Sequence, residues 1–268
     1  MTRRDPAELA RAMRLAVLRM TSSGQASHVG SCLSVTDILA TIYGAVARVR
    51  PEDPQWSDRD RVIVSKGHVA AATYAVLAEL DYFPKAWLDD YSKPGSPLIG
   101  HVSHKIPGVE LSTGSLGHGL PVACGMALAS RRAGAGWGAF VVLSDGELDE
   151  GSNWEAALFA AHHRLDNVTA VVDYNRLQGF GRTDDVLGLE PLADKWRAFG
   201  WRVMEVDGND TQALEKALTT APDDGVPSLV IGHTVKGRGV SFMEDQLAWH
   251  YKTPTPEQFE QALKELQA

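Results

Sequence analysis

The order of apolar and polar residues predicts a chain in which helices and strands alternate. Stretches with an apolar residue at every third or fourth position indicate amphipathic helices, and short runs that are apolar throughout indicate buried strands. The first helix is expected at Pro6–Ser23, where Leu9, Met13 and Val17 share one face. The second is expected at residues 34–46, with Ser34 as its N-cap.

Five short runs are the predicted strands; two of the five, at residues 139–143 and 168–173, are apolar on both faces. They cover residues 61–65, 139–143, 168–173, 202–206 and 229–232. Further helices are expected up to Leu80, at residues 117–132, at 153–163 with Ser152 as cap, at 192–199, at 211–219 and after Pro256. Because strands that are apolar on both faces alternate with helices, we expect an α/β fold: a doubly wound, mostly parallel sheet with helices on both faces. Ligands of such sheets bind beyond the carboxyl ends of the strands.

The composition is that of a soluble globular protein. The 268 residues are 44% hydrophobic and 22% charged, so we expect one domain spanning residues 1–268. With a net charge of −8 and no basic run, the chain lacks the surface that binds nucleic acid. No apolar run approaches the ~20 residues that cross a bilayer, and no secretory signal is recognisable. Cys32 and Cys124 form neither a disulfide framework nor a metal knuckle, and we expect a cytoplasmic protein.

Polar residues follow two predicted strands in a pattern that suits a divalent cation. Asp145 and Gly146 come directly after the strand at 139–143, and Asn175 follows the next strand, thirty residues after Asp145. Because these strand ends are neighbours in a βαβ unit, the carboxylate and the amide oxygen can hold Mg²⁺ or Ca²⁺ together with phosphate oxygens and water. Gly146 lets a diphosphate approach the main chain. A plain turn at Asp145 and a cap at Asn175 are the alternative.

Two other groups of residues fit an anionic ligand. The Gly-rich stretch 112–119 can present N–H groups to an anion, although a close helix contact would also explain it. Several histidines in loops favour a site that handles protons or anionic oxygens. These are His28, His68, His101, His104, His118 and His250. In the acidic run after Asp145, we expect Glu147 and Asp149 to be solvated and Glu150 to lie near the ligand.

Together these motifs resemble the transketolase family. The thiamine diphosphate and metal motif of that family, usually Gly-Asp-Gly followed by Asn, is similar to Ser144-Asp145-Gly146 followed by Asn175. Other motifs in the family's order are Ser65-Lys66-Gly67-His68, Gly100-His101, Gly114-Ser115-Leu116-Gly117 and Trp249-His250. The likeness covers the amino-terminal, diphosphate-binding part of a full-length transketolase. The chain thus resembles the small subunit of split transketolases, whose pyrimidine-binding half is a separate polypeptide.

The resemblance implies roles for individual residues. Asp145, Asn175 and the main-chain carbonyl of Leu177 would ligate Mg²⁺ or Ca²⁺. Thiamine diphosphate would be bound by His68, Gly114, Leu116, Asp145, Gly146, Glu150, Glu155, Asn175, Lys236 and His250. His28, His101 and His250 would be the catalytic residues that move protons at the substrate hydroxyls.

The implied reaction is the transfer of a two-carbon ketol unit from a ketose or ketose phosphate to an aldehyde acceptor. Thiamine diphosphate supplies the electron sink for cleaving the bond next to a carbonyl. The carboxylate that activates the aminopyrimidine would belong to the partner, so the chain alone is expected to be inactive and to work in an α2β2 assembly. The alternatives are a subunit of a 2-oxo acid dehydrogenase or decarboxylase, and a non-catalytic diphosphate-binding module.

Some positions depart from the family pattern. Ser144 replaces the usual Gly, and His104, His118 and Tyr251 stand where other residues are common. The segment after Asn175 also differs. If these sites border the substrate channel, the acceptor is unusual, for instance a nucleotide-linked sugar or a carrier-bound group.

Overall fold

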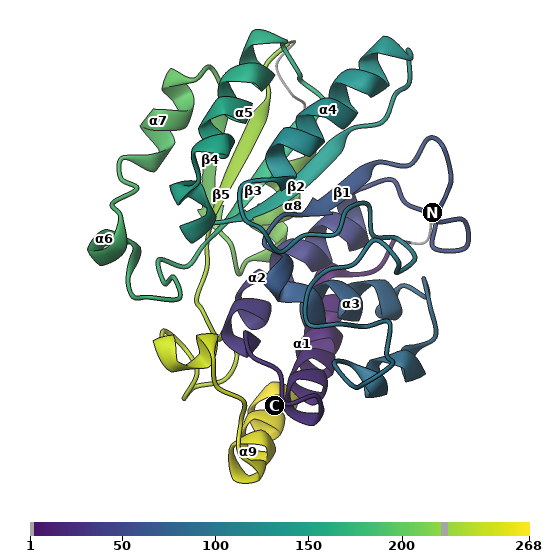
Figure 1. Ribbon diagram of the computed structural model, residues 1–268, viewed down its shortest axis with the longest axis vertical. Helices are drawn as coiled ribbons and strands as arrows, with labels where there is room; N and C mark the ends of the chain where they lie inside the picture. Colours follow the sequence, from purple (N-terminus) through teal and green to yellow (C-terminus); the bar gives the residue numbers. More distant parts are fainter. Residues whose placement is uncertain (1–2, 221–224) are drawn as a thin grey trace.

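The computed structural model describes residues 3–220 and 225–268. In this part of the chain, five strands form one sheet in the order β1-β2-β3-β5-β4, and every neighbouring pair is parallel (Figure 1). The strands are β1 (Arg61–Val64), β2 (Ala139–Ser144), β3 (Val168–Tyr174), β4 (Arg202–Asp207) and β5 (Ser228–His233). The predicted α/β fold with its parallel sheet is confirmed.

Helices cover both faces of the sheet (Figure 1). One face carries α4 (Gly119–Arg132), α5 (Gly151–His162) and α7 (Leu192–Ala198); the other carries α1 (Pro6–Ser23), α2 (Val29–Thr41), α3 (Ala70–Glu79) and α8 (Thr211–Thr219). Successive residues of β2 therefore face different cores: Val141 packs into the cluster beneath α4 and α5, and Val142 into the cluster beneath α2 and α3. This two-sided burial explains why the inner strands β2, β3 and β5 are mostly apolar on both faces, whereas the edge strand β4 carries Arg202 and Glu205.

The second predicted helix begins earlier than expected. It starts at Val29, five residues before Ser34, and continues through a π-helical turn at Ile42–Val46. The prediction of Ser34 as N-cap is wrong: its fully buried hydroxyl donates to the Asp173 carboxylate. The residue that precedes the helix is His28, whose backbone is left-handed with φ 71°.

The helix after β2 also begins before its predicted cap. Glu150 precedes α5, so the assignment of Ser152 as cap is wrong as well. The Ser152 hydroxyl instead donates to the Gly117 carbonyl at 2.7 Å. In both helices a serine that resembles a cap makes a tertiary contact, because the preceding residues are compatible with the helix and extend it.

One helical segment of the described residues, Val29–Val46, is long and apolar enough to cross a membrane by length and composition. Its mean hydropathy is 1.5, and 94% of it is buried inside the fold. Contact with the sheet and the neighbouring helices accounts for this composition.

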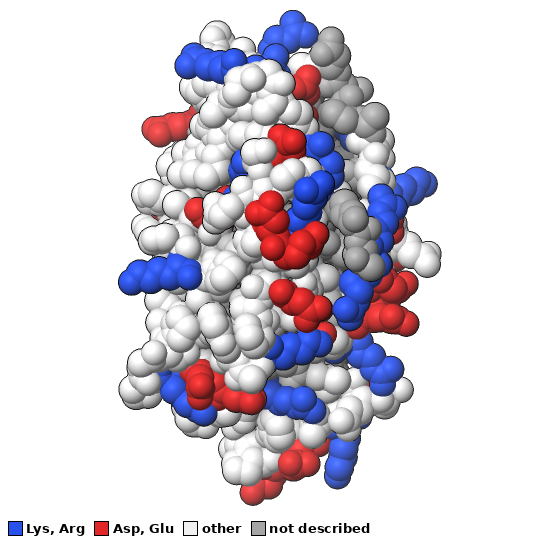
Figure 2. Space-filling view, turned by 90° about the vertical axis from the view of Figure 1, so that its right-hand side faces the viewer, with Lys and Arg blue, Asp and Glu red and all other residues white. Residues whose placement is uncertain are grey.

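The remaining helical elements complete the fold. They are 3₁₀ turns at Gly67–Val69, Lys85–Asp90, Gly146–Asp149 and Leu247–His250, and the helices α6 (Thr183–Val186) and α9 (Pro256–Gln267). Figure 2 shows the side of the molecule on the right in Figure 1, where acidic and basic side chains of the described residues are interspersed. Mixed charges of this kind produce no strong single-sign field over that face.

Candidate functional site

A cavity of about 460 Å³ lies at the carboxyl ends of β1, β2 and β3. The following predicted site residues line it: His28, His68, His101, Gly114, Leu116, Asp145, Gly146, Glu150, Asn175, Leu177, Lys236 and His250. Glu155 lies outside it, exposed on α5. The fold thus brings together residues spread over more than two hundred positions of the sequence.

The tips of β2 and β3 are adjacent, as the strand pattern predicts. Ser144 is paired in register with Asp173, so the residues that follow, Asp145 and Asn175, reach the same cavity. The Asp145 carboxylate is almost fully buried and accepts N–H bonds from Gly146 at 2.7 Å and Arg176 at 2.5 Å. The alternative of a plain turn does not explain why this carboxylate is held inside a cavity.

The charge of Asp145 lacks full compensation. Burial, reinforced by the nearby Asp173 carboxylate, raises the pKa of Asp145 to about 6. A cation bound beside it would favour the charged form and lower that pKa. Among the described residues no group of three or more His, Cys, Asp and Glu side chains could hold a metal by itself. The donors available are therefore one carboxylate, the Asn175 amide oxygen and main-chain carbonyls, a hard oxygen set that fits Mg²⁺ or Ca²⁺ completed by phosphate and water.

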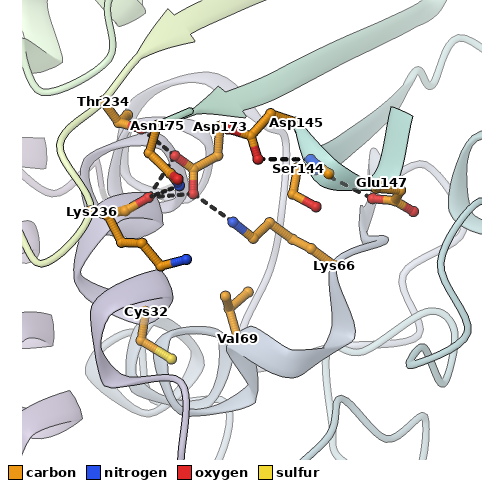
Figure 3. Close-up of polar contacts among 12 residues, drawn as sticks. Cys32, Lys66, Val69, Ser144, Asp145, Glu147, Asp173, Asn175, Thr234 and Lys236 are labelled. Carbon is orange, nitrogen blue, oxygen red and sulfur yellow. Dashed lines mark hydrogen bonds and ion pairs between the residues drawn. The ribbon is translucent and has the colours of Figure 1, made fainter. Parts of the chain in front are cut away.

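A buried ion pair that the sequence analysis did not predict lies behind these strand tips. The Lys66 ammonium points to Asp173, with Nζ 2.6 Å from Oδ2 (Figure 3), and both side chains are at most 1% exposed. The Ser34 and Thr234 hydroxyls also donate to Asp173. Lys66 lines the cavity, so it adds a positive charge to the ligand-binding surface. Its position between an apolar strand and a run of alanines was the available signal.

A second buried lysine lies on the opposite side of the cavity. Lys236 is 1% exposed, and its ammonium donates to the Leu177 carbonyl at 2.7 Å and to His250 Nδ1 at 3.0 Å. Burial, followed by repulsion from Lys66, lowers the pKa of Lys236 to about 8. Two buried ammonium groups in one cavity are suited to a ligand with more than one negative charge.

Four histidines converge on the cavity. The ring of His28 lies 5.1 Å from that of His68, 6.3 Å from that of His101 and 4.9 Å from that of His250. Burial lowers the pKa of His28 to about 4 and that of His250 to about 3, and it holds the pKa of His68 well below its usual value. These three imidazoles are therefore neutral at pH 7 and can donate or accept protons.

Glu147 ties the Gly-rich loop to the turn after β2. Its carboxylate is fully buried and accepts an N–H bond from Gly117 at 2.9 Å as well as the Ser65 hydroxyl. The expectation that Glu147 is solvated is wrong, because its hydrogen bonds replace water. Gly117 has φ 81°, a backbone conformation that other residues rarely adopt. This anchoring brings the main chain of Gly114 to the same cavity as Gly146.

The departures from the family pattern do not all face the cavity. Tyr251, which is 58% exposed, lines it, and so do Gln178 and the 87% exposed Phe180. His104 lies elsewhere, with Nδ1 2.6 Å from the Ser112 hydroxyl, and His118 is exposed with Nδ1 2.9 Å from the Leu116 carbonyl. In this chain, neither His104 nor His118 lines the cavity to which the hypothesis of an unusual acceptor assigned them.

Comparisons with known proteins point to one family. Residues 6–264 match the family model for the thiamine diphosphate binding domain of transketolase. The chain is 45% identical to an apulose-4-phosphate transketolase subunit of Actinobacillus succinogenes over 259 residues, which are 96% of this chain and 94% of that protein. It is 43% identical to 6-deoxy-6-sulfo-D-fructose transketolase subunit SqwG of Clostridium sp. over 242 residues, which are 90% of this chain and 88% of that protein. Transketolase from Leishmania mexicana has a similar structure, with a TM-score of 0.92 and 28% identity over 99% of this chain; the chain spans 42% of the length of that protein.

Proposed function

The chain belongs to the transketolase family, and on that premise we propose that it is the diphosphate-binding subunit of a split transketolase. In this proposal residues 1–268 form one domain that holds thiamine diphosphate and a divalent cation. With a separate pyrimidine-binding subunit, it transfers a two-carbon ketol unit from a ketose to an aldehyde. The placement of Asp145 and Asn175 at adjacent strand ends, in a cavity with two buried lysines, is the observation that carries the proposal.

We assign the cation to the strand tips. Asp145, Asn175 and the Leu177 carbonyl would hold Mg²⁺ or Ca²⁺, and the diphosphate would supply further oxygens. His68, His250, Lys66 and Lys236 would surround the diphosphate with hydrogen-bond donors and positive charge. The main chain at Gly114 and Gly146 and the side chains of Leu116 and Glu150 would complete the cofactor site.

In the proposed reaction, the cofactor and the protein side chains have different roles. Thiamine diphosphate, when bound, supplies the electron sink that makes the carbon–carbon bond beside a carbonyl cleavable. His28 and His101, whose rings lie 6.3 Å apart in the cavity, would exchange protons with the substrate hydroxyls. The His28 main-chain N–H donates to the His250 carbonyl at 2.9 Å, which holds these loops together across the cavity.

The proposal needs a partner that covers the cavity. Phe180 and Tyr251 are exposed apolar groups at its edge, and exposed aromatic residues beside a binding site are typical of surfaces that a partner buries. Two similar proteins are themselves named as subunits of transketolases, which also supports a second polypeptide. Glu155, exposed on α5, would lie towards that interface, in a cytoplasmic α2β2 assembly.

The substrate would be a ketose with an anionic tail. One relative is named for apulose 4-phosphate and another for 6-deoxy-6-sulfo-D-fructose. Lys66 and Lys236, the lysines that line the cavity among the described residues, are both buried and bonded, so the partner would bind the anionic tail. This ketose is the donor. The nucleotide-linked or carrier-bound acceptor is not part of the proposal, because His104 and His118, which motivated it, do not line the cavity.

Isothermal titration calorimetry of the purified chain with thiamine diphosphate and Mg²⁺ tests the cofactor site. We expect metal-dependent binding that is lost in Asp145→Ala and kept in the exposed control Asp90→Ala. Adding a candidate pyrimidine-binding subunit should then give transfer from a ketose donor but no activity with a 2-oxo acid. Cofactor binding without any turnover, whichever partner is added, would favour a non-catalytic module; turnover of a 2-oxo acid would favour a dehydrogenase subunit.

A further inference from the structure

The contact between Lys236 and His250 determines where the imidazole carries its proton. Lys236 Nζ lies 3.0 Å from His250 Nδ1 and 2.7 Å from the Leu177 carbonyl oxygen. An ammonium group has only donors, so both of its partners are acceptors. Nδ1 of His250 is therefore unprotonated, and the proton of the neutral ring is on Nε2.

The Nε2 side of the ring is free to meet a ligand. No described residue forms a hydrogen bond with Nε2. Gly179 lies beside it: a Cβ atom there would lie 3.3 Å from Nε2 and 2.6 Å from the Tyr251 hydroxyl. Because residue 179 is a glycine, it places no side chain between Nε2 and the cavity that both residues line. The ring is otherwise fixed, because the His250 carbonyl accepts the His28 N–H and the ring packs against that of His28.

We propose that Lys236 is a positioning residue that fixes His250 as the Nε2–H tautomer, so that His250 faces the cavity as a hydrogen-bond donor. This inference deepens the proposed function and rests on it for the nature of the ligand. The hydrogen-bond acceptor of the His250 Nε2–H would be an oxygen of the diphosphate or of the substrate. His250 then binds that oxygen and does not take a proton from the substrate. Proton abstraction falls to His28 and His101.

The surroundings of Lys236 support a role in orienting His250, in addition to the positive charge that it brings to the cavity. Its side chain is buried along its length, and the next residue, Gly237, donates its N–H to the Gly30 carbonyl at 3.0 Å. The Lys236 carbonyl in turn accepts the Asp245 N–H at 2.9 Å. The main chain around Lys236 is thus held on both sides, and burial restricts the side chain, so the ammonium has a fixed position from which it can orient His250.

Long-range proton–nitrogen NMR correlation of the ¹⁵N-labelled full chain tests the tautomer directly. The His250 signals are assigned by their loss in His250→Asn. In the wild-type chain we expect Nδ1 to resonate as an unprotonated nitrogen and Nε2 as a protonated one. A protonated Nδ1 would overturn the proposal, and this measurement requires no variant at Lys236.

Variants at Lys236 test the cause. Lys236→Met should give a mixture of tautomers, and Lys236→Arg should restore the single one, because a guanidinium also only donates. The matched control is Lys252→Met, an exposed lysine two residues after His250. An unchanged tautomer in Lys236→Met would refute the positioning role.

Binding data separate this proposal from the function on which it rests. With inorganic pyrophosphate and Mg²⁺ as the probe, loss of the Nε2–H donor in His250→Phe should weaken binding about tenfold. If the tautomer is as expected and pyrophosphate does not bind, the proposed function fails and the tautomer assignment stands. If pyrophosphate binds but Nδ1 carries the proton, only the inference about Lys236 fails.

Discussion

Lys66 and Asp173 form an ion pair with 2.6 Å between Nζ and Oδ2, and neither side chain is more than 1% exposed. Removal of one partner of such a pair leaves an uncompensated buried charge. We therefore expect Lys66→Met and Asp173→Asn each to reduce the free energy of unfolding by about 3 kcal/mol or more. Urea denaturation of the purified chain measures this.

The double variant Lys66→Met/Asp173→Asn should lose clearly less than the sum of the two single losses, because neither charge is then left unpaired. The control is Lys93→Met, which breaks an exposed pair with Asp90 and should change the free energy of unfolding by at most about 0.5 kcal/mol. Additive losses at Lys66 and Asp173 would show that the pair is not the source of the stability.

The fold was predictable where burial on both faces leaves a simple pattern. All five predicted strands occur within one residue of their expected bounds. The inner strands β2, β3 and β5 give the clearest pattern, because they are buried on both faces of a parallel sheet. Asp145 and Asn175 could be placed together for the same reason: their positions follow from the adjacency of two strand ends.

The burial of polar and charged side chains that pair with distant residues could not be predicted from the local sequence pattern. Ser34 resembles a cap, Lys66 a turn residue and Glu147 a solvated acid when each is considered in its own segment. Their partners, Asp173 and the loop around Gly117, are between 30 and 139 residues away in sequence. Local patterns contain no information about such pairs, so the charge network behind the cavity became visible only in the three-dimensional structure.

The proposed cofactor should stabilise the chain only when a divalent cation is present. At a hundred times its dissociation constant, a ligand that binds only the folded state adds about 2.7 kcal/mol. We expect thermal unfolding with thiamine diphosphate and Mg²⁺ to shift upwards, and EDTA to reverse the shift. Asp145→Ala should show no shift under any of these conditions. An equal shift with EDTA would mean that the cation does not bridge the ligand to Asp145.

The neutral state of His28 makes stability depend on pH. Burial lowers its folded pKa to about 4, below the unfolded value of 6.5. Between these values the unfolded chain binds a proton that the folded chain does not, so stability falls as the pH falls. Between pH 7 and pH 5 we expect wild type to lose about 1–2 kcal/mol more than His28→Asn, a range that allows for the partial exposure of the ring.

Denaturation at several pH values, compared between wild type and variant, measures this difference. The comparison cancels the opposite contribution of Asp145, whose raised pKa of about 6 makes the folded chain bind a proton first. Replacement of the exposed His162 by Asn provides the matched control for the loss of an imidazole. Parallel curves for wild type and His28→Asn would contradict the burial of a neutral imidazole.

Phe180 offers the sharpest test of the partner surface. It lines the cavity and is 87% exposed, so little packing within this chain depends on it. We expect Phe180→Asp to leave the unfolding free energy of the isolated chain within about 0.5 kcal/mol of wild type. The same variant should weaken association with the pyrimidine-binding subunit by about tenfold or more, because a charge replaces an apolar side chain that the partner would bury. Analytical ultracentrifugation of the mixed subunits measures this.

Ala7→Asp introduces the same charge on an exposed position of α1 outside the cavity and should associate like wild type. Equal weakening by both variants would show that net charge, and not contact at Phe180, controls association.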